Sequence, residues 1–66
     1  MVIKINGKDE SIEGAATIGE LISKKGLLPE RIVIEYNYHI TPKEDWHAIM
    51  LNENDNVEIV SFVGGG

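Results

Sequence analysis

The sequence predicts a small α+β domain in which a single helix packs on one face of a β-sheet. An Asn-Gly pair at positions 6 and 7 lies between two short strand patterns and is the strongest local signal for a β-hairpin. One amphipathic helical pattern begins at Thr17, and further strand-like runs occupy the second half of the chain. Because only one substantial helix is expected, it can cover only one face of the sheet.

The chain is expected to open with two antiparallel strands. Val2–Ile5 and Lys8–Ile12 form the arms of the predicted hairpin, and Asn6-Gly7 suits the two positive φ angles of a type I′ turn. Alternate residues of a strand share one side. In the returning strand these residues are Lys8, Glu10 and Ile12.

The helix is predicted to begin with a capping box. The Thr17 hydroxyl can accept a hydrogen bond from the Glu20 amide while the Glu20 carboxylate reaches back to the Thr17 amide. Gly26 is predicted to end the helix in a left-handed conformation. Gly19 weakens the helix by about 1 kcal/mol relative to alanine, so packing must hold it. The apolar stripe that faces the core consists of Ile18, Leu21 and Ile22.

The second half of the chain alternates strand patterns with turns. A strand is predicted at Arg31–Tyr36, followed by a turn at Asn37-Tyr38 and one helical turn at Pro42–Trp46, where proline suits the first position. The remaining predicted elements are a short strand at Ala48–Leu51, a polar turn at Asn52–Asn56 and a last strand at Val57–Val63.

Composition excludes several classes of function. The 66 residues contain no cysteine, which removes disulfides and thiolate metal sites, and 42% hydrophobic residues are enough for a folded core. Eleven acidic residues against six basic ones give a net charge of −5. Phosphate binding needs clustered lysine and arginine, so nucleic acid is a poor partner, whereas a basic protein surface is a suitable one. The charged start at Lys4 is unlike a signal peptide or membrane span, so we expect a cytoplasmic location.

The last predicted strand carries large apolar side chains on both faces. Val57 and Ile59 point one way, and Glu58, Val60 and Phe62 point the other. If the first pair faces the helix, Val60 and Phe62 lie on the uncovered face, which predicts a docking patch. Scattered surface residues, or cover by a neighbouring loop, would leave the same pattern.

Three glycines, Gly64, Gly65 and Gly66, follow this strand directly. We therefore divide the chain into a domain at 1–63 and a flexible tail at 64–66. Glycine has no Cβ, so such an arm can enter a narrow cleft of another protein and present a terminal carboxylate there. A frayed end or a remnant of cloning is the alternative interpretation.

Three segments together carry a resemblance to a known family. They are the opening hairpin at 2–8, the stretch at 37–46 with its asparagine, proline, basic and aromatic residues, and the ending at 55–66. In these segments the chain resembles ThiS, the family of sulfur carrier proteins of thiamine biosynthesis, within the ubiquitin-like β-grasp group. The resemblance extends over the whole chain and implies a β-grasp roll with a mixed sheet of four or five strands. Gly64 is one glycine more than the family's minimal Gly-Gly ending.

The resemblance also implies a chemistry at Gly66. A chain-terminal carboxylate ionises near pH 3.3–3.7, so at neutral pH it is an anion and a poor electrophile. In the family, an E1-like adenylating enzyme uses ATP and Mg²⁺ to make the acyl-adenylate. A sulfur donor such as a cysteine desulfurase then yields a thiocarboxylate, and thiazole synthase receives the sulfur.

By the same resemblance the chain is a co-substrate that binds no cofactor or metal and supplies no catalytic residue. Gly64, Gly65 and Gly66 would enter a partner's active site, with Gly66 as the attachment point. Partner docking is assigned to residues of the last strand and its end: Glu58, Val60 and Phe62.

Other candidate sites are weaker. His39 and His47 are eight residues apart, with no cysteine in the chain and no predicted helix that would bring them together, so surface histidines are favoured over a metal site. Trp46 is predicted to close one end of the core. The adjacent Glu44 and Asp45 suit a solvated turn better than an acid–base pair.

Two other functions would use the same glycine tail. The small subunit of molybdopterin synthase shares the fold and the thiocarboxylate logic, although its members tend to be longer and to lack the pattern at 37–46. A ubiquitin-like modifier would instead form amide bonds to protein lysines and would give a ladder of conjugates on an immunoblot.

Overall fold

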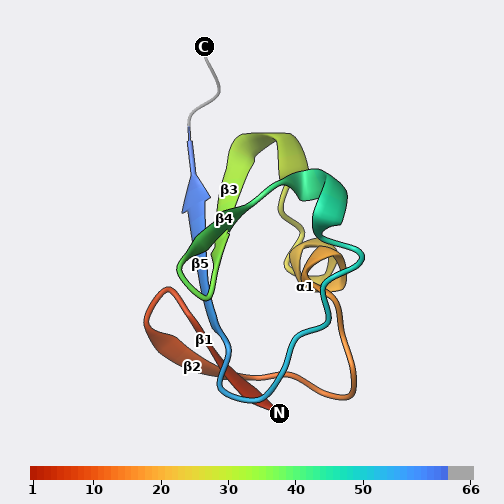
Figure 1. The fold of residues 1–66 in the computed structure, drawn as a ribbon, viewed down its shortest axis with the longest axis vertical. Coiled ribbons are helices and arrows are strands. Elements are labelled where there is room, and N and C mark those ends of the chain that lie inside the picture. Colours follow the sequence, from red (N-terminus) through yellow and green to blue (C-terminus); the bar gives the residue numbers. More distant parts are fainter. Residues whose placement is uncertain (63–66) are drawn as a thin grey trace.

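The computed structural model describes residues 1–62 and shows a mixed five-stranded sheet with one helix on one of its faces (Figure 1). The strand order is β2-β1-β5-β3-β4, in which β1 and β5 run parallel and the other neighbours are antiparallel. The expected α+β roll is therefore confirmed. Its elements are β1 (Val2–Ile5), β2 (Lys8–Ser11), α1 (Ile18–Lys24), the 3-10 turn η1 (Pro29–Arg31), β3 (Ile32–Tyr36), β4 (His39–Thr41), the 3-10 turn η2 (Lys43–Asp45) and β5 (Asn56–Ser61).

The first hairpin forms as predicted. Asn6 and Gly7 have φ angles of 51° and 82°, which are those of a type I′ turn. The returning strand is one residue shorter than expected because β2 ends at Ser11. Ile12 leaves the sheet and enters the core, where it is 9% exposed.

The predicted capping box and helix end are both present. The Glu20 amide donates to Thr17 Oγ1 at 3.1 Å, and the Thr17 amide donates to Glu20 Oε1 at 2.8 Å. Gly26 has a φ of 70°, and the Leu27 amide donates to the Ile22 carbonyl at 3.2 Å. These bonds satisfy main-chain groups that a helix leaves open at its ends.

Gly19 is held by close packing, as its weak helix propensity requires. Its amide donates to the Trp46 carbonyl at 2.9 Å, and the preceding Ile18 amide donates to the Ile49 carbonyl at 3.0 Å. A Cβ built at position 19 would overlap the His47 ring. Glycine is therefore the residue that lets the segment after η2 approach the start of α1.

The segment that follows η2 corrects one prediction. The strand expected at Ala48–Leu51 is wrong, since this segment contains a turn and an isolated bridge between Met50 and Thr17. Its main chain caps α1, and the Leu51 amide donates to the Ala16 carbonyl at 2.8 Å. Its apolar pattern therefore reflects contact with the helix start rather than membership of the sheet.

A second hairpin was predicted only in part. Asn37 and Tyr38 form the expected turn, with φ angles of 47° and 71° that again correspond to type I′. The returning strand β4 was missed because three residues are too few to show alternation. The strand before the turn begins at Ile32 rather than Arg31, because Pro29–Arg31 forms η1.

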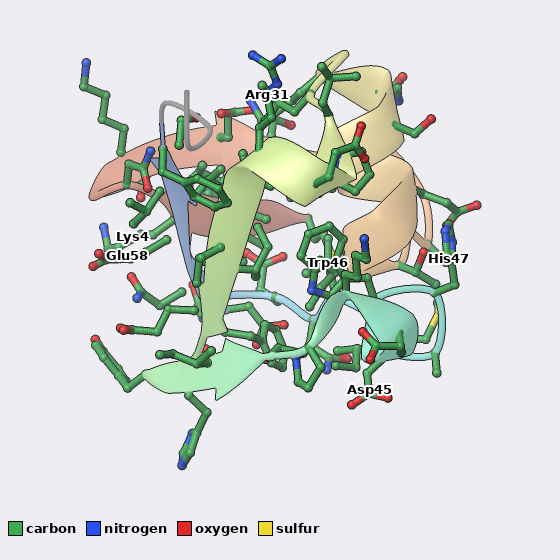
Figure 2. All side chains as sticks on the ribbon, turned by 90° about the horizontal axis from the view of Figure 1, so that it is seen from above. Lys4, Arg31, Asp45, Trp46, His47 and Glu58 are labelled. Carbon is green, nitrogen blue, oxygen red and sulfur yellow. The ribbon has the colours of Figure 1, made fainter. Side chains whose placement is uncertain are left out.

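The core lies between the inner face of the sheet and α1. Trp46 is 4% exposed and sits between the two layers, where its Nε1 donates to the Thr41 carbonyl at 2.9 Å (Figure 2). The prediction that Trp46 closes the core is confirmed. The other buried hydrophobic residues are Ile3, Ile5, Ile12, Ile18, Leu21, Ile22, Ile32, Ile34, Leu51 and Val57.

A buried carboxylate fixes the start of β5. Asp55 is 8% exposed and accepts hydrogen bonds from the Tyr36 hydroxyl at 2.6 Å, the Asn52 amide at 2.7 Å and Asn37 Nδ2 at 3.2 Å. Burial, followed by the hydrogen bond to Asp55 and its charge, raises the pKa of Tyr36. The polar turn expected at Asn52–Asn56 is shorter, because Asn56 already belongs to β5.

Candidate functional site

The two sides of β5 divide as the sequence predicts. Val57 is fully buried and Ile59 packs against the core, whereas Glu58 and Val60 are exposed on the face that α1 does not cover. The strand ends at Ser61, two residues earlier than expected, and the Phe62 amide then donates to the Arg31 carbonyl at 3.0 Å. The tail residues Gly64–Gly66 lie outside the described residues, as does Val63.

Exposed apolar side chains gather on the uncovered face. Val60 lies directly opposite Val33 on β3, and Ile40 lies opposite Glu35, so Ile40 shares this face. Val60 is 55% exposed and Ile40 is 72% exposed. We call Val33, Ile40 and Val60 the outer patch. Contiguous exposed apolar groups of this kind mark surfaces that other proteins cover.

Phe62 forms a wall between two surface hollows at the end of the sheet. One hollow, of about 330 Å³, includes Val33, Ile40 and Trp46 in its lining, and the other, of about 390 Å³, includes Leu28. Phe62 lines both and is 46% exposed. An apolar side chain of a partner could therefore enter from either side of Phe62.

Next to the outer patch, the same face is acidic. Glu35 on β3 and Glu58 on β5 stand directly opposite each other. Glu58 and Lys4 lie on the side of the sheet away from α1 (Figure 2). Lys4 Nζ forms an ion pair with Asp9 Oδ1 at 2.9 Å. Over residues 1–62 the ion pairs are this one and one between Lys25 and Glu10, so neither glutamate of the opposed pair takes part in an ion pair among these residues.

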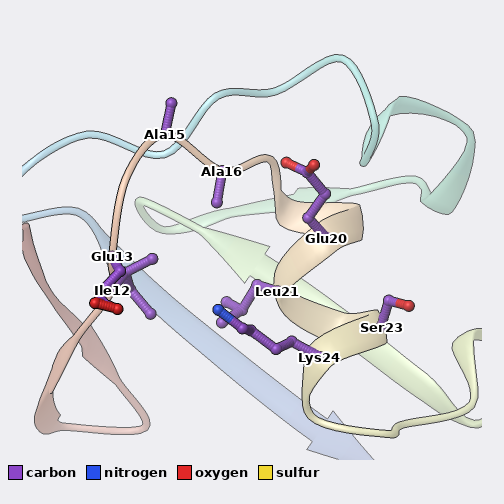
Figure 3. A pocket seen from close by; sticks show the side chains of 8 residues that line it. All are labelled: Ile12, Glu13, Ala15, Ala16, Glu20, Leu21, Ser23 and Lys24. Carbon is purple, nitrogen blue, oxygen red and sulfur yellow. The ribbon is translucent and has the colours of Figure 1, made fainter.

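Residues 1–62 contain further hollows and polar groups away from the outer patch. A hollow of about 370 Å³ lies beside α1 (Figure 3). Of its lining residues, Glu20 is already used in the capping box. His39 and His47 are both exposed. In the described part of the chain, no group of three or more His, Cys, Asp or Glu side chains is arranged to hold a metal, and no helix is long and apolar enough to cross a membrane.

Comparison with known proteins assigns the chain to a family. Residues 3–66 match the model of the ThiS family. The chain belongs to the ThiS family. The match includes the glycine tail and the whole sheet except Val2, the first residue of β1, so it covers both the domain and the segment on which the chemistry of Gly66 would depend.

Individual members and relatives agree with this assignment. The sulfur carrier protein ThiS of Bacillus subtilis is 36% identical over 66 residues, which cover 98% of this chain and 100% of that protein. The crystal structure of the thiamine biosynthesis protein ThiS from Geobacter metallireducens matches with a TM-score of 0.85 and 29% identity, with both chains fully covered. The β-grasp fold that the resemblance implied is thereby confirmed.

A longer relative gives a different kind of match. A thiazole synthase from Paramagnetospirillum magneticum is 32% identical over 66 residues, which cover all of this chain but 20% of that protein. The chain thus spans a fifth of that relative's length. A ThiS-like segment therefore occurs within a protein that carries the thiazole synthase name.

Some residues of this surface were not found from the sequence. Val33 and Ile40 were not predicted, because each is a single apolar residue outside the last strand. Asn6 was assigned only to a turn, yet its side chain contacts the main chain of β5.

Proposed function

We propose that this chain is a sulfur carrier for formation of the thiazole ring of thiamine, with the sulfur held on Gly66. The observation that carries the proposal is the ThiS family match over residues 3–66, which takes in the glycine tail. The working protein must then end at Gly66, because only a free α-carboxylate can be activated. The same match favours thiamine biosynthesis over the alternative assignment to molybdopterin synthase.

The proposed activation has two steps, adenylation of the Gly66 carboxylate and replacement of AMP by sulfur. A carboxylate oxygen of Gly66 attacks the α-phosphorus of ATP, and the bond to the β-phosphate oxygen breaks, which releases pyrophosphate and leaves an acyl-adenylate. Bisulfide then attacks the acyl carbon, AMP leaves with the bonding electron pair, and a proton is released as the thiocarboxylate forms. When the donor is a protein persulfide, a thiol must also cleave the resulting acyl disulfide.

The role of the carrier in these steps is geometric. The domain would dock on the partner, and the glycines Gly64–Gly66, which have no side chains, would enter a narrow active site. Reaction requires the attacking oxygen within about 3–3.5 Å of the phosphorus and in line with it. The carrier therefore acts as a co-substrate of an E1-like adenylating enzyme, in a cytoplasm that supplies ATP and Mg²⁺, rather than as an enzyme.

The outer patch, together with Glu58 and Phe62, is the proposed docking surface. It lies at the end of β5 from which the tail departs, so a partner that covers it also receives the tail. Apolar anchors in the centre of an interface contribute most of its binding energy. The net charge of −5 favours partners with a basic surface.

Thiazole synthase is the proposed recipient of the sulfur. Support comes from the relative named thiazole synthase that contains a segment 32% identical to this whole chain. Joining a carrier to its acceptor in one polypeptide raises their effective concentration. Such an arrangement is useful only if the two domains meet during the reaction.

The proposal is tested by reconstitution. The chain is incubated with a matched adenylating enzyme, ATP, Mg²⁺ and sulfide, and ATP–pyrophosphate exchange and the mass of the carrier are followed. We expect exchange that depends on the carrier, and replacement of one oxygen by sulfur at Gly66. Exchange without the carrier, or a mass gain at an internal residue, would contradict the proposal.

A further inference from the structure

The side chain of Asn6 continues a sheet ladder that the main chain of β1 cannot continue. The parallel pairing of β1 with β5 ends at Ile5, opposite Val57, because the chain then turns back into β2. Beyond that point Asn6 Oδ1 accepts from the Ile59 amide at 2.7 Å, and Asn6 Nδ2 donates to the Ile59 carbonyl at 3.3 Å. The Asn6 amide also donates to the Val57 carbonyl at 2.9 Å.

These contacts extend the part of β5 that is held on both sides. On its other side, β5 pairs with β3 as far as Ser61, and the Phe62 amide still reaches the Arg31 carbonyl. On the β1 side, the hydrogen bonds of the Asn6 side chain extend the supported part of β5 from Val57 to Ile59. Ile59 lies three positions before Phe62, the last described residue, so the clamp lies near the base of the tail.

The turn conformation accounts for the choice of asparagine. Asn6 has a φ of 51°, which asparagine tolerates better than most residues with a side chain. Its amide offers both an acceptor and a donor, and so it can replace both main-chain groups of a missing strand residue. Glycine would suit the turn equally well but would leave Ile59 without these two bonds.

We propose that Asn6 is a positioning residue that fixes the direction in which β5 delivers the glycine tail to the adenylating enzyme. This inference rests on the proposed function. A strand supported on one side can twist and bend, and such a displacement changes where β5 presents the base of the tail relative to the docking surface. Because reaction depends on alignment of the attacking oxygen, such a displacement slows the chemical step more than it weakens docking.

A second asparagine supplies a matched control. Asn37 also occupies the first position of a type I′ turn, and its Oδ1 accepts from the Asn56 amide at 2.8 Å. It therefore clamps the same strand at the end far from the tail. Asn37→Gly and Asn6→Gly both keep the turn and remove a clamp, at opposite ends of β5. Asn37→Gly also removes the Nδ2 donor to the buried Asp55, so its cost in stability should be the larger of the two.

The experiment measures kcat and KM for the carrier in ATP–pyrophosphate exchange, together with melting temperature and amide hydrogen exchange at Phe62. For Asn6→Gly we expect kcat to fall on the order of tenfold, KM to stay within about twofold and the Phe62 amide to exchange faster. Asn6→Asp keeps the acceptor but sets a second carboxylate oxygen against the Ile59 carbonyl, so its kcat should also fall below that of wild type. Asn37→Gly should lower the melting temperature at least as much and leave kcat near wild type.

The outcomes separate this inference from the function on which it rests. Wild-type carrier that supports no exchange would refute the proposed function. Wild-type exchange combined with an unchanged kcat for both Asn6 variants would refute the positioning role. Equal losses of kcat in Asn6→Gly and Asn37→Gly at matched stability would show that the clamps only stabilise the fold. Should Asn37→Gly fail to fold, Asn6→Gly alone still decides: a lower kcat with an unchanged KM supports the positioning role, and an unchanged kcat refutes it.

Discussion

Val60→Asp should separate docking from folding. A fully buried valine side chain contributes about 1.5–3 kcal/mol, and Val60 is 55% exposed, so the lost burial is worth roughly 1 kcal/mol. The lower strand propensity of aspartate adds up to about 1 kcal/mol. For a domain of this size, each 1 kcal/mol lowers the melting temperature by about 4–8 °C. We therefore expect a folded variant whose melting temperature falls by about 5–15 °C.

The effect on activation should be larger. Loss of an interface anchor costs about 2 kcal/mol or more, which corresponds to roughly a thirtyfold rise in KM for the carrier. ATP–pyrophosphate exchange well below the melting temperature measures this rise. Met50→Asp is the control, because Met50 is 47% exposed and pairs with Thr17 at the helix start rather than on the uncovered face. Equal KM values for the two variants would refute the assignment of the outer patch to docking.

Three further changes test other parts of the structure. Gly65→Val should abolish thiocarboxylate formation with little change in melting temperature, because a Cβ widens and restricts the arm; full exchange by this variant would show that the arm is not recognised for its narrowness. Glu35→Gln should raise stability by a few tenths of a kcal/mol, since it removes repulsion from Glu58 across the strands, while KM rises; a loss of stability in urea unfolding would contradict this reasoning. Because the pKa of Tyr36 is raised in the folded state, the unfolded chain loses its proton first as pH rises through about 10, and stability should fall there. Tyr36→Phe should be less stable at neutral pH, where it lacks the hydrogen bond to Asp55, and should lose this alkaline decline; a decline that persists in urea titrations would assign it to another group.

Short sequence motifs that are compatible with only one local backbone conformation predicted their turns and helix ends correctly. The Asn6-Gly7 turn, the capping box from Thr17 and the helix end at Gly26 each follow from backbone chemistry, and all three are present. The alternation along β5 correctly predicted that Val60 points outward. Alternate residues of a strand face opposite sides of the sheet, and here only one side is covered.

The failures came where tertiary contacts override local pattern. The apolar residues at 48–51 resemble a strand, but their main chain is used to cap the start of α1. β4 is too short to show a pattern, and it forms because the type I′ turn at Asn37-Tyr38 sends the chain back along β3. No sequence signal distinguished Asn6 as a clamp on Ile59, because that contact joins residues 53 positions apart.

The most direct test of the central claim is the intact mass of the carrier isolated from the organism that produces it, with fragmentation of its last residues. We predict a polypeptide that ends at Gly66, of which a fraction carries one oxygen-to-sulfur replacement within the terminal glycine. That fraction should disappear when the adenylating enzyme is deleted. A chain that continues past Gly66, or sulfur found only at other positions, would contradict a carrier that works through its terminal thiocarboxylate.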